Sequence, residues 1–376
     1  MAGIYIHIPF CRQACTYCNF HFSTSQKNKE AYINALVKEI SLSQQFINES
    51  DPIETIYFGG GTPSLLSIDE INKILDAIRK RFSIDANAEI TLETNPDDVN
   101  ENILQQWQYA GINRLSLGIQ SFNEDELKWM NRAHNATQAM QSLHWIKQAG
   151  FKNYSVDLIY GSPLLNNAEF KKNVAFIFQH EVPHISCYAL TVEPKTLLNK
   201  LIETKKSLPI NTDKQAEQFE LLMMWMNENG YEHYEISNFA KPGQRSRHNS
   251  SYWQGKPYYG FGPAAHSFNG KNIRRWNIAN NALYIKSLEQ NIIPFEEEIL
   301  TEQQQVNEFV MISLRTIEGI NLEKIESSFG EKYRSTILKS AEKFMASGTL
   351  VTLDNHLQLT AKGKFLADGI AAALFL

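Results

Sequence analysis

Three of the four cysteines of this 376-residue chain stand close together near the N-terminus. Cys11, Cys15 and Cys18 form the pattern CxxxCxxC, directly after a run of apolar and β-branched residues that predicts a strand. Three thiolates on one short loop can bind three corners of an iron–sulfur cube, which needs four ligands. The pattern therefore predicts a 4Fe-4S cluster in which one iron has no protein ligand.

An open iron indicates a second cofactor. It can be chelated by the amino and carboxylate groups of S-adenosylmethionine (SAM), and the cluster can then pass one electron to the sulfonium. The C–S bond breaks and leaves a 5′-deoxyadenosyl radical. Two other interpretations stay open, namely a zinc site completed by His7 or His21 and three cysteines packed in the interior. The spacing of three residues and then two is uncommon for zinc and favours the cluster.

A glycine-rich segment follows the second predicted strand. Residues 59–63 read GGGTP. Consecutive glycines let backbone amides and carbonyls approach a ligand closely, and the ammonium of SAM is the natural ligand beside such a cluster. A simple turn is the alternative for this motif alone.

Runs of β-branched and aromatic residues alternate with helical patterns over the first half of the chain. This alternation predicts βα units and a parallel sheet. Six units are fewer than the eight of a closed TIM barrel, so we expect an open, partial barrel or a doubly wound sheet. The predicted strands are Gly3–Ile8, Glu54–Phe58, Glu89–Glu93, Arg114–Gly118, Tyr154–Leu158 and His184–Cys187.

Polar residues fall near the carboxyl ends of these strands, where both architectures bind their ligands. Tyr5 and His7 share one face of the first strand, because side chains alternate with a period of two. Glu93 ends the third strand, Gln120 follows the fourth, and Asp157 lies near the end of the fifth. We expect these groups to meet at one rim.

The helices carry their own boundary residues. Ser67 and Glu70 form a capping box before an apolar-periodic segment, while Gly111 and Gly150 stand where a left-handed helix end favours glycine. A further helix is expected over residues 212–229.

Three segments are expected along the chain. Residues 1–240 form the partial barrel, and residues 241–300 form a connector rich in aromatic residues and histidine, with a long irregular stretch over 241–270. Residues 301–376 form a smaller α+β domain. Its helical patterns and the following hairpin around Asp354 and Asn355 are typical of a winged-helix-like unit.

The composition is that of a globular protein, with 43% hydrophobic and 20% charged residues. The formal net charge of -5 offers no general electrostatic attraction for nucleic acid. The N-terminus lacks the basic and apolar regions of a secretory signal, and no apolar run is long enough to cross a bilayer. We expect a cytoplasmic protein.

Taken together, these motifs resemble the radical SAM family that contains oxygen-independent coproporphyrinogen III oxidase and the haem chaperone HemW. The resemblance runs from the first strand to the C-terminus and implies a partial (βα)6 TIM-type barrel. It is carried by IYIHIPFC at 4–11, YFGGGTPS at 57–64, ETNP at 93–96 and RLSLGIQSF at 114–122.

The resemblance implies which residues contact SAM. Glu93 and Asp157 can accept hydrogen bonds from it, and Arg132 can pair with its carboxylate. Each residue alone would also suit a surface or capping role, but their convergence on one rim favours a site. The implied set is Tyr5, Tyr17, Gly60, Gly61, Thr62, Glu93, Gln120, Arg132 and Asp157, with Thr191 a weaker candidate.

The chain departs from the oxidase in a way that resembles the chaperone branch. The oxidase has an additional cysteine two residues after the cluster motif and a longer N-terminal extension, whereas this chain has Phe20 and a first strand that begins at residue 3. Residues 247–253, RHNSSYW, also resemble the HNxxYW segment of the chaperones, and YGFGPAAHS follows at 259–267.

Two histidines of these segments are candidate haem ligands, because an imidazole among flat aromatic rings suits a porphyrin. His248 is the first candidate and His266 the second. A histidine that is hydrogen-bonded within a packed loop is the alternative for each. Cys187 fits a small core residue, although a cysteine can also ligate haem iron.

The resemblance and the winged-helix-like C-terminal pattern together give three candidate functions. The favoured one is a haem chaperone that uses haem, SAM and the cluster and passes haem to apo-haemoproteins. The alternative is the oxidase, which decarboxylates propionates of a porphyrinogen. A remote alternative is a cluster-based redox sensor with a DNA-binding winged helix, which the acidic balance disfavours. No catalytic residue is assigned.

Overall fold

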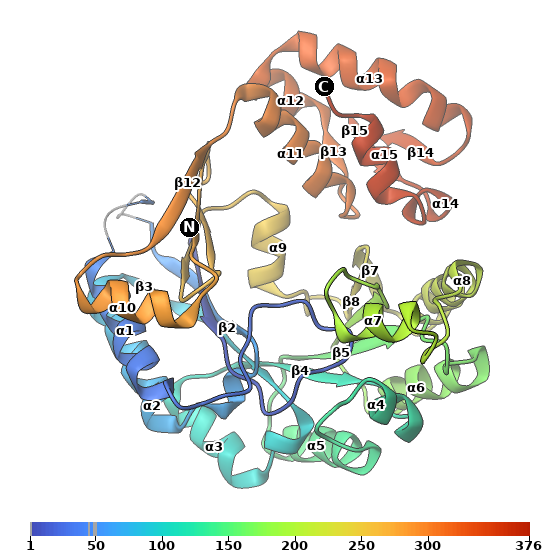
Figure 1. Cartoon of the computed structure of the whole chain (residues 1–376). Coiled ribbons are helices and arrows are strands. Elements are labelled where there is room, and N and C mark those ends of the chain that lie inside the picture. Colours follow the sequence, from blue (N-terminus) through green and yellow to red (C-terminus); the bar gives the residue numbers. More distant parts are fainter. Residues whose placement is uncertain (1, 44–45, 48–50) are drawn as a thin grey trace.

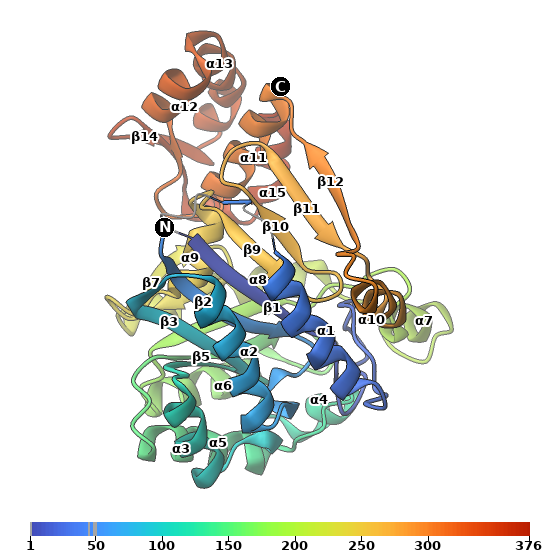
Figure 2. The same cartoon turned by 90° about the vertical axis from the view of Figure 1, so that its left-hand side faces the viewer.

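The computed structural model describes residues 2–43, 46–47 and 51–376. Figures 1 and 2 show two units, a large sheet covered by helices and a smaller C-terminal unit beyond it. Within the described residues, no helix has both the length and the apolar character needed to cross a membrane.

The large unit is built on six parallel strands that lie side by side in chain order. They are β1 (Ala2–Ile8), β2 (Ile53–Gly60), β3 (Ile84–Thr94), β4 (Arg114–Gln120), β5 (Tyr154–Tyr160) and β6 (His184–Ala189). All six predicted strands are confirmed. The sheet stays open, since its order over the described residues begins at β12 and ends at β7.

Helices cover the outer face of this sheet, as an arc around the strands in Figure 1. They are α1 (Lys29–Leu42), α2 (Ile68–Arg81), α3 (Glu101–Ala110), α4 (Glu124–Trp129), α5 (Ala136–Gln148), α6 (Asn167–Gln179) and α8 (Thr212–Glu228), with short 3-10 turns at Pro63–Leu65 and Pro96–Asp98. The short helix α7 (Leu197–Glu203) instead contacts the loop that follows β1.

The expected helix boundaries are confirmed. Ser67 and Glu70 make both hydrogen bonds of a capping box at the start of α2. Gly111 ends α3 with φ 103°, and Gly150 follows α5 with φ 81°, both in the left-handed region that favours glycine.

Strand alternation separates the core from the site. Ile4, Ile6 and Ile8 are fully buried in the core beneath the helices. Tyr5 and His7 stand on the opposite face of β1, which is the inner face of the sheet. The same strand therefore secures the core and presents polar groups to the interior.

The prediction that residues 241–270 are irregular is wrong, because this stretch contains a helix and two strands. The sheet gains short strands at both edges: β9 pairs in parallel with β1, and β8 pairs with β6. These strands are too short for a clear alternation in the sequence, and they form by pairing with edges that the chain has already built. The elements are β7 (Glu232–Glu235), β8 (Asn238–Ala240), α9 (Arg247–Trp253), β9 (Tyr258–Phe261), β10 (His266–Phe268), β11 (Ile273–Asn277), α10 (Asn281–Glu289) and β12 (Phe295–Ile299).

The C-terminal unit has its own core, to which Val310, Ile337 and Leu357 belong. The expected helices and hairpin are present, and the hairpin turns through Asp354 and Asn355, both with positive φ. The elements are α11 (Glu302–Leu314), β13 (Ile320–Asn321), α12 (Leu322–Phe329), α13 (Glu331–Ala346), β14 (Leu350–Leu353), β15 (His356–Leu359), α14 (Ala361–Lys364) and α15 (Ala367–Ala373).

Candidate functional site

The cysteine loop leaves the carboxyl end of β1 and is fixed on both sides. The Cys11 amide donates to Ser23 O over 3.0 Å. Farther along, the Thr16 amide donates to Met130 O over 3.0 Å, and Thr16 O accepts from the Leu198 amide over 2.7 Å. Backbone contacts with the ends of α4 and α7 therefore hold a loop that has no regular structure of its own.

The glycine motif packs directly beneath this loop. The Gly61 amide donates to Ile8 O over 2.8 Å, and the Thr62 amide donates to Phe10 O over 2.7 Å. A Cβ on Gly61 would lie only 2.6 Å from Phe10 O, so any larger residue must displace the cysteine loop. The close approach that the sequence predicts for a ligand is made here by the chain itself.

The three cysteines carry free thiols and are partly exposed. Burial raises the pKa of Cys11 to about 11 and also raises the pKa of Cys18. The thiols of Cys11 and Cys18 therefore hold their protons at neutral pH until iron replaces them, as thiolate ligation requires.

Arg132 joins the cysteine loop to the rim of the sheet. Its Nη1 donates to the Cys15 Sγ over 3.2 Å, and its Nη2 donates to Asn95 Oδ1 over 2.6 Å and to Gly118 O over 2.7 Å. Its Nε is buried and has no hydrogen-bond partner among the described residues. A cationic donor with spare capacity beside three thiols fits an anionic cluster and a carboxylate-bearing cofactor.

The two histidines that could complete a zinc site, His7 and His21, are both hydrogen-bonded to other groups of the protein. The His7 ring bonds to His21 O over 2.8 Å and to the Tyr5 hydroxyl over 3.1 Å, while His21 bonds to Asn281 over 2.7 Å. The described part of the chain contains no group of three His, Cys, Asp or Glu side chains placed around a single ion. Cluster thiolates differ in this respect, because each one binds its own iron.

Glu93 is the central acid of the rim. It accepts hydrogen bonds from the Tyr57 hydroxyl over 2.8 Å and from the Gly60 amide over 3.1 Å. Burial raises the pKa of Glu93 to about 7, and the charge of Asp157 adds to the rise. Burial also raises the pKa of Asp157 to about 6, against the opposing hydrogen bond from Ser186. The two carboxyl groups therefore share one electrostatic environment.

The remaining candidate SAM residues differ in their distance from the rim and in their exposure. Tyr5 stacks on Tyr57, with ring centroids 6.1 Å apart, on the same inner face as Glu93. Gln120 ends β4 beside Gly118, at a bulge and with a left-handed φ of 69°. Tyr17 packs against a small cluster below the cysteine loop, whereas Thr191 is exposed and follows the end of β6.

His248 is buried beside β2 and is hydrogen-bonded at both ring nitrogens. Its Nδ1 bonds to Thr55 over 2.8 Å and its Nε2 to Tyr252 over 2.9 Å, and the side chain is buried. The ring stacks on Tyr57 at 4.9 Å. In this conformation both imidazole nitrogens are engaged, as the packed-loop alternative expects. His266 is exposed and stacks on Trp276 at 6.2 Å.

Cys187 is buried in the main core, with a pKa that burial raises above its usual range. It is placed as the small core residue that the sequence suggests. Tyr57 is the residue at this rim that sequence reasoning missed, and it bonds to Glu93 and stacks on His248. Its alternation with Thr55 and Gly59 on one face of β2 was the available signal.

Comparisons with known proteins agree with this geometry. The model of the radical SAM superfamily matches residues 5–177, and the model of the HemN C-terminal domain matches residues 300–366. The solved structure of coproporphyrinogen III oxidase (HemN) from Escherichia coli is similar in fold, with a TM-score of 0.85 and 22% sequence identity, over 100% of this chain and 90% of that one. The fold and the cysteine loop thus define a radical SAM protein, with a 4Fe-4S cluster and SAM as its cofactors.

Relatives that match over the full length of the chain show which family of radical SAM proteins it belongs to. The heme chaperone HemW of Lactococcus lactis is 34% identical over 97% of both chains. The heme chaperone HemW of Bacillus subtilis is 33% identical over 99% of both chains. The chain belongs to the HemW family.

The contact between Gly61 and the cysteine loop makes a first prediction. In Gly61→Ala the added methyl group must push Phe10 O away, at a cost of about 1–3 kcal/mol. We expect the variant to take up less iron and sulfide than the wild type during anaerobic reconstitution, as measured by metal analysis. Gly369→Ala, whose added Cβ meets no atom within 4 Å, is the control. Equal iron content in all three proteins would contradict this account.

The pKa of Glu93 makes a second prediction. We expect the ionised form of Glu93 to accept hydrogen bonds from SAM, so SAM affinity should rise as the pH increases through the Glu93 pKa of about 7. Tyr57→Phe removes a hydrogen bond that lowers the pKa of Glu93, and the rise should move to higher pH. Anaerobic calorimetry between pH 5.5 and 8 measures the effect, with Tyr258→Phe as the control. Identical profiles for Tyr57→Phe and the wild type would refute the role of Tyr57.

Proposed function

We propose that this protein is a haem chaperone, which binds haem, a 4Fe-4S cluster and SAM and delivers haem to apo-haemoproteins in the cytoplasm. The observation that carries the proposal is similarity over the whole length of both chains to relatives named heme chaperones, at 33–34% identity. The similarity to the oxidase structure is one of fold.

The cluster side of the proposal rests on a small group of residues. Cys11, Cys15 and Cys18 would hold the cluster, and Arg132 lies against Cys15. When bound, a reduced cluster supplies an electron to the sulfonium of SAM. Arg132 would pair with the carboxylate of SAM, and Glu93 would accept hydrogen bonds from its hydroxyl or ammonium groups; the contacts of both residues at the rim support these roles.

Phe20 favours the chaperone over the oxidase. It stands where the resemblance places an additional cysteine in the oxidase, and its side chain is 66% exposed. An exposed aromatic ring two residues after Cys18 offers an apolar surface next to the cysteine loop instead of another thiol.

We propose that the haem iron is bound by one of two histidines, His248 or His266. His266 is exposed at the surface, yet neighbouring atoms still cover part of its ring. This partial burial and the nearby charge of Arg274 lower the pKa of His266, which keeps the ring neutral for iron binding. Its neighbour Trp276 provides a flat apolar wall. His248 would have to leave Thr55 and Tyr252 first, so we propose His266 as the ligand that the described conformation presents.

Haem titration tests this proposal. We expect wild-type protein to give a saturable Soret band, and we expect His266→Ala to weaken haem affinity by at least about ten-fold, equivalent to about 1.4 kcal/mol. His144→Ala, which removes an exposed imidazole on α5, is the matched control. The melting temperature of His248→Ala is measured as well, because this variant leaves buried Thr55 and partly buried Tyr252 without their hydrogen-bond partner.

Each outcome of the titration tests a different part of the haem-chaperone proposal. Negligible haem binding by the wild type would refute the chaperone proposal. Unchanged affinity in His266→Ala, with loss of binding in a folded His248→Ala, would move the ligand to His248. Transfer of bound haem to an apo-haemoprotein, followed by absorption, tests delivery itself.

A further inference from the structure

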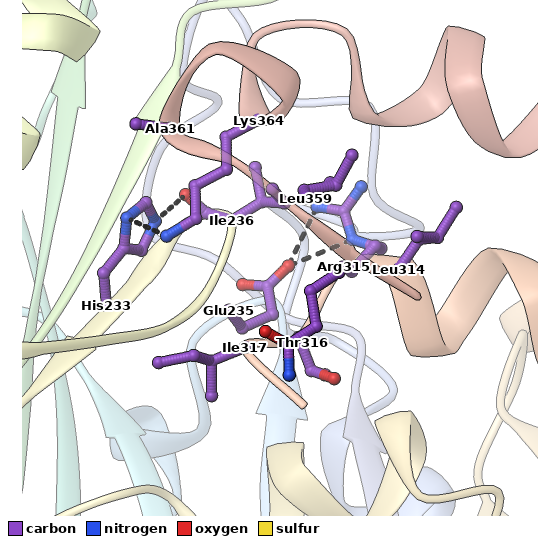
Figure 3. A pocket seen from close by; sticks show the side chains of 11 residues that line it. His233, Glu235, Ile236, Leu314, Arg315, Thr316, Ile317, Leu359, Ala361 and Lys364 are labelled. Carbon is purple, nitrogen blue, oxygen red and sulfur yellow. Dashed lines mark hydrogen bonds and ion pairs between the residues drawn. The ribbon is translucent and has the colours of Figure 1, made fainter. Parts of the chain in front are cut away.

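A cavity of about 150 Å³ lies where the edge of the large sheet meets the C-terminal unit (Figure 3). Its walls come from the end of β7, the end of α11, and the segment that leads from β15 into α14. Backbone hydrogen bonds fix this junction: the Ile236 amide donates to Arg315 O, and the Ile317 amide donates to Tyr234 O, each over 3.0 Å. The cavity is therefore part of the joint between the two units.

Lys364 brings a positive charge to this cavity. Its ammonium donates to His233 Nδ1 over 2.9 Å, and the His233 Nε2–H donates to Ile236 O over 3.0 Å. His233 must then be neutral, because its Nδ1 acts as an acceptor. Burial and the charge of Lys364 lower the pKa of His233 to about 3, in agreement with this assignment. The ammonium thus has an uncharged partner and spare N–H donors.

The carboxylate in the cavity wall is already engaged. Glu235 Oε1 accepts from Arg315 over 3.0 and 2.9 Å, and its Oε2 accepts from the Ser237 amide over 2.9 Å and from Asn238 over 2.6 Å. Arg315 also pairs with Asp368 over 3.0 Å. Among the described residues, no ion pair joins Lys364 to a carboxylate, and even a partly buried ammonium without an anion is unfavourable.

We propose that this cavity is a binding site for a small oxyanion, a phosphate or a carboxylate of a few atoms, held by the Lys364 ammonium. Its volume corresponds to about five water molecules, which is room for such an ion and much less than a porphyrin needs. The bound oxyanion supplies the negative charge that Lys364 lacks. Because the walls belong to both units, occupancy stabilises the junction between them.

The protonation of Lys364 sets the pH range of binding. His233 and Glu235 face it from β7, Arg315 from the end of α11, and Asp368 belongs to α15. Burial lowers the pKa of Lys364 to about 8. Oxyanion affinity should therefore fall as the pH rises above about 8, where the ammonium loses its proton.

Titration of the full-length protein with sodium phosphate or sodium acetate, at ionic strength held constant with sodium chloride, tests the proposal. We expect a saturable rise in the melting temperature of the wild type with phosphate, acetate or both, and the response shows which oxyanion fits. Lys364→Met should lose the rise. Lys362→Met should keep it, because the Lys362 ammonium bonds to Ser347 O outside the cavity.

Acylation of lysines followed by peptide mass spectrometry gives a second readout on the wild type, which stays decisive even where Lys364→Met does not fold. An oxyanion at ten times its dissociation constant should slow acylation of Lys364 by about ten-fold and leave Lys362 unchanged. Unchanged acylation of Lys364 with both oxyanions, or an equal thermal response in Lys364→Met, would overturn the proposal.

Discussion

The structure depends on the close contact between the chain leaving β1 and the glycine motif after β2. Two hydrogen bonds and the absence of room for a side chain at Gly61 fix where the cysteine loop begins. The loop has no regular structure, so its thiols are placed by this contact, by the backbone bonds of Cys11 and Thr16, and by Arg132 against Cys15. A cluster site with three ligands requires that placement, because each thiolate must reach its own iron.

A series of side-chain contacts connects the cysteine loop and the rim of the sheet to helix α9. Arg132 touches Cys15 and the end of β4, while Glu93 receives hydrogen bonds from Gly60 and Tyr57. Tyr57 in turn stacks on His248 of α9. The residues proposed to serve SAM and the segment typical of haem chaperones are therefore in physical contact through one tyrosine.

Local patterns predicted much of this architecture. The six parallel strands, the capping box of α2 and the cysteine loop depend on short stretches of sequence and are confirmed. The edge strands β9 and β8 depend on partners far along the chain and left no local pattern. His248 shows the same limit for the site, because its engagement by Thr55 and Tyr252 exists only once α9 packs against β2.

The central claim is that three thiolates hold an iron–sulfur cube whose remaining iron binds SAM. Electron–nuclear double resonance on the reduced, reconstituted protein, with SAM carrying ¹⁵N in its amino group, measures this most directly. The account predicts a hyperfine coupling between the cluster and the labelled nitrogen. A cluster signal without that coupling, in protein shown by calorimetry to be saturated with SAM, would contradict it.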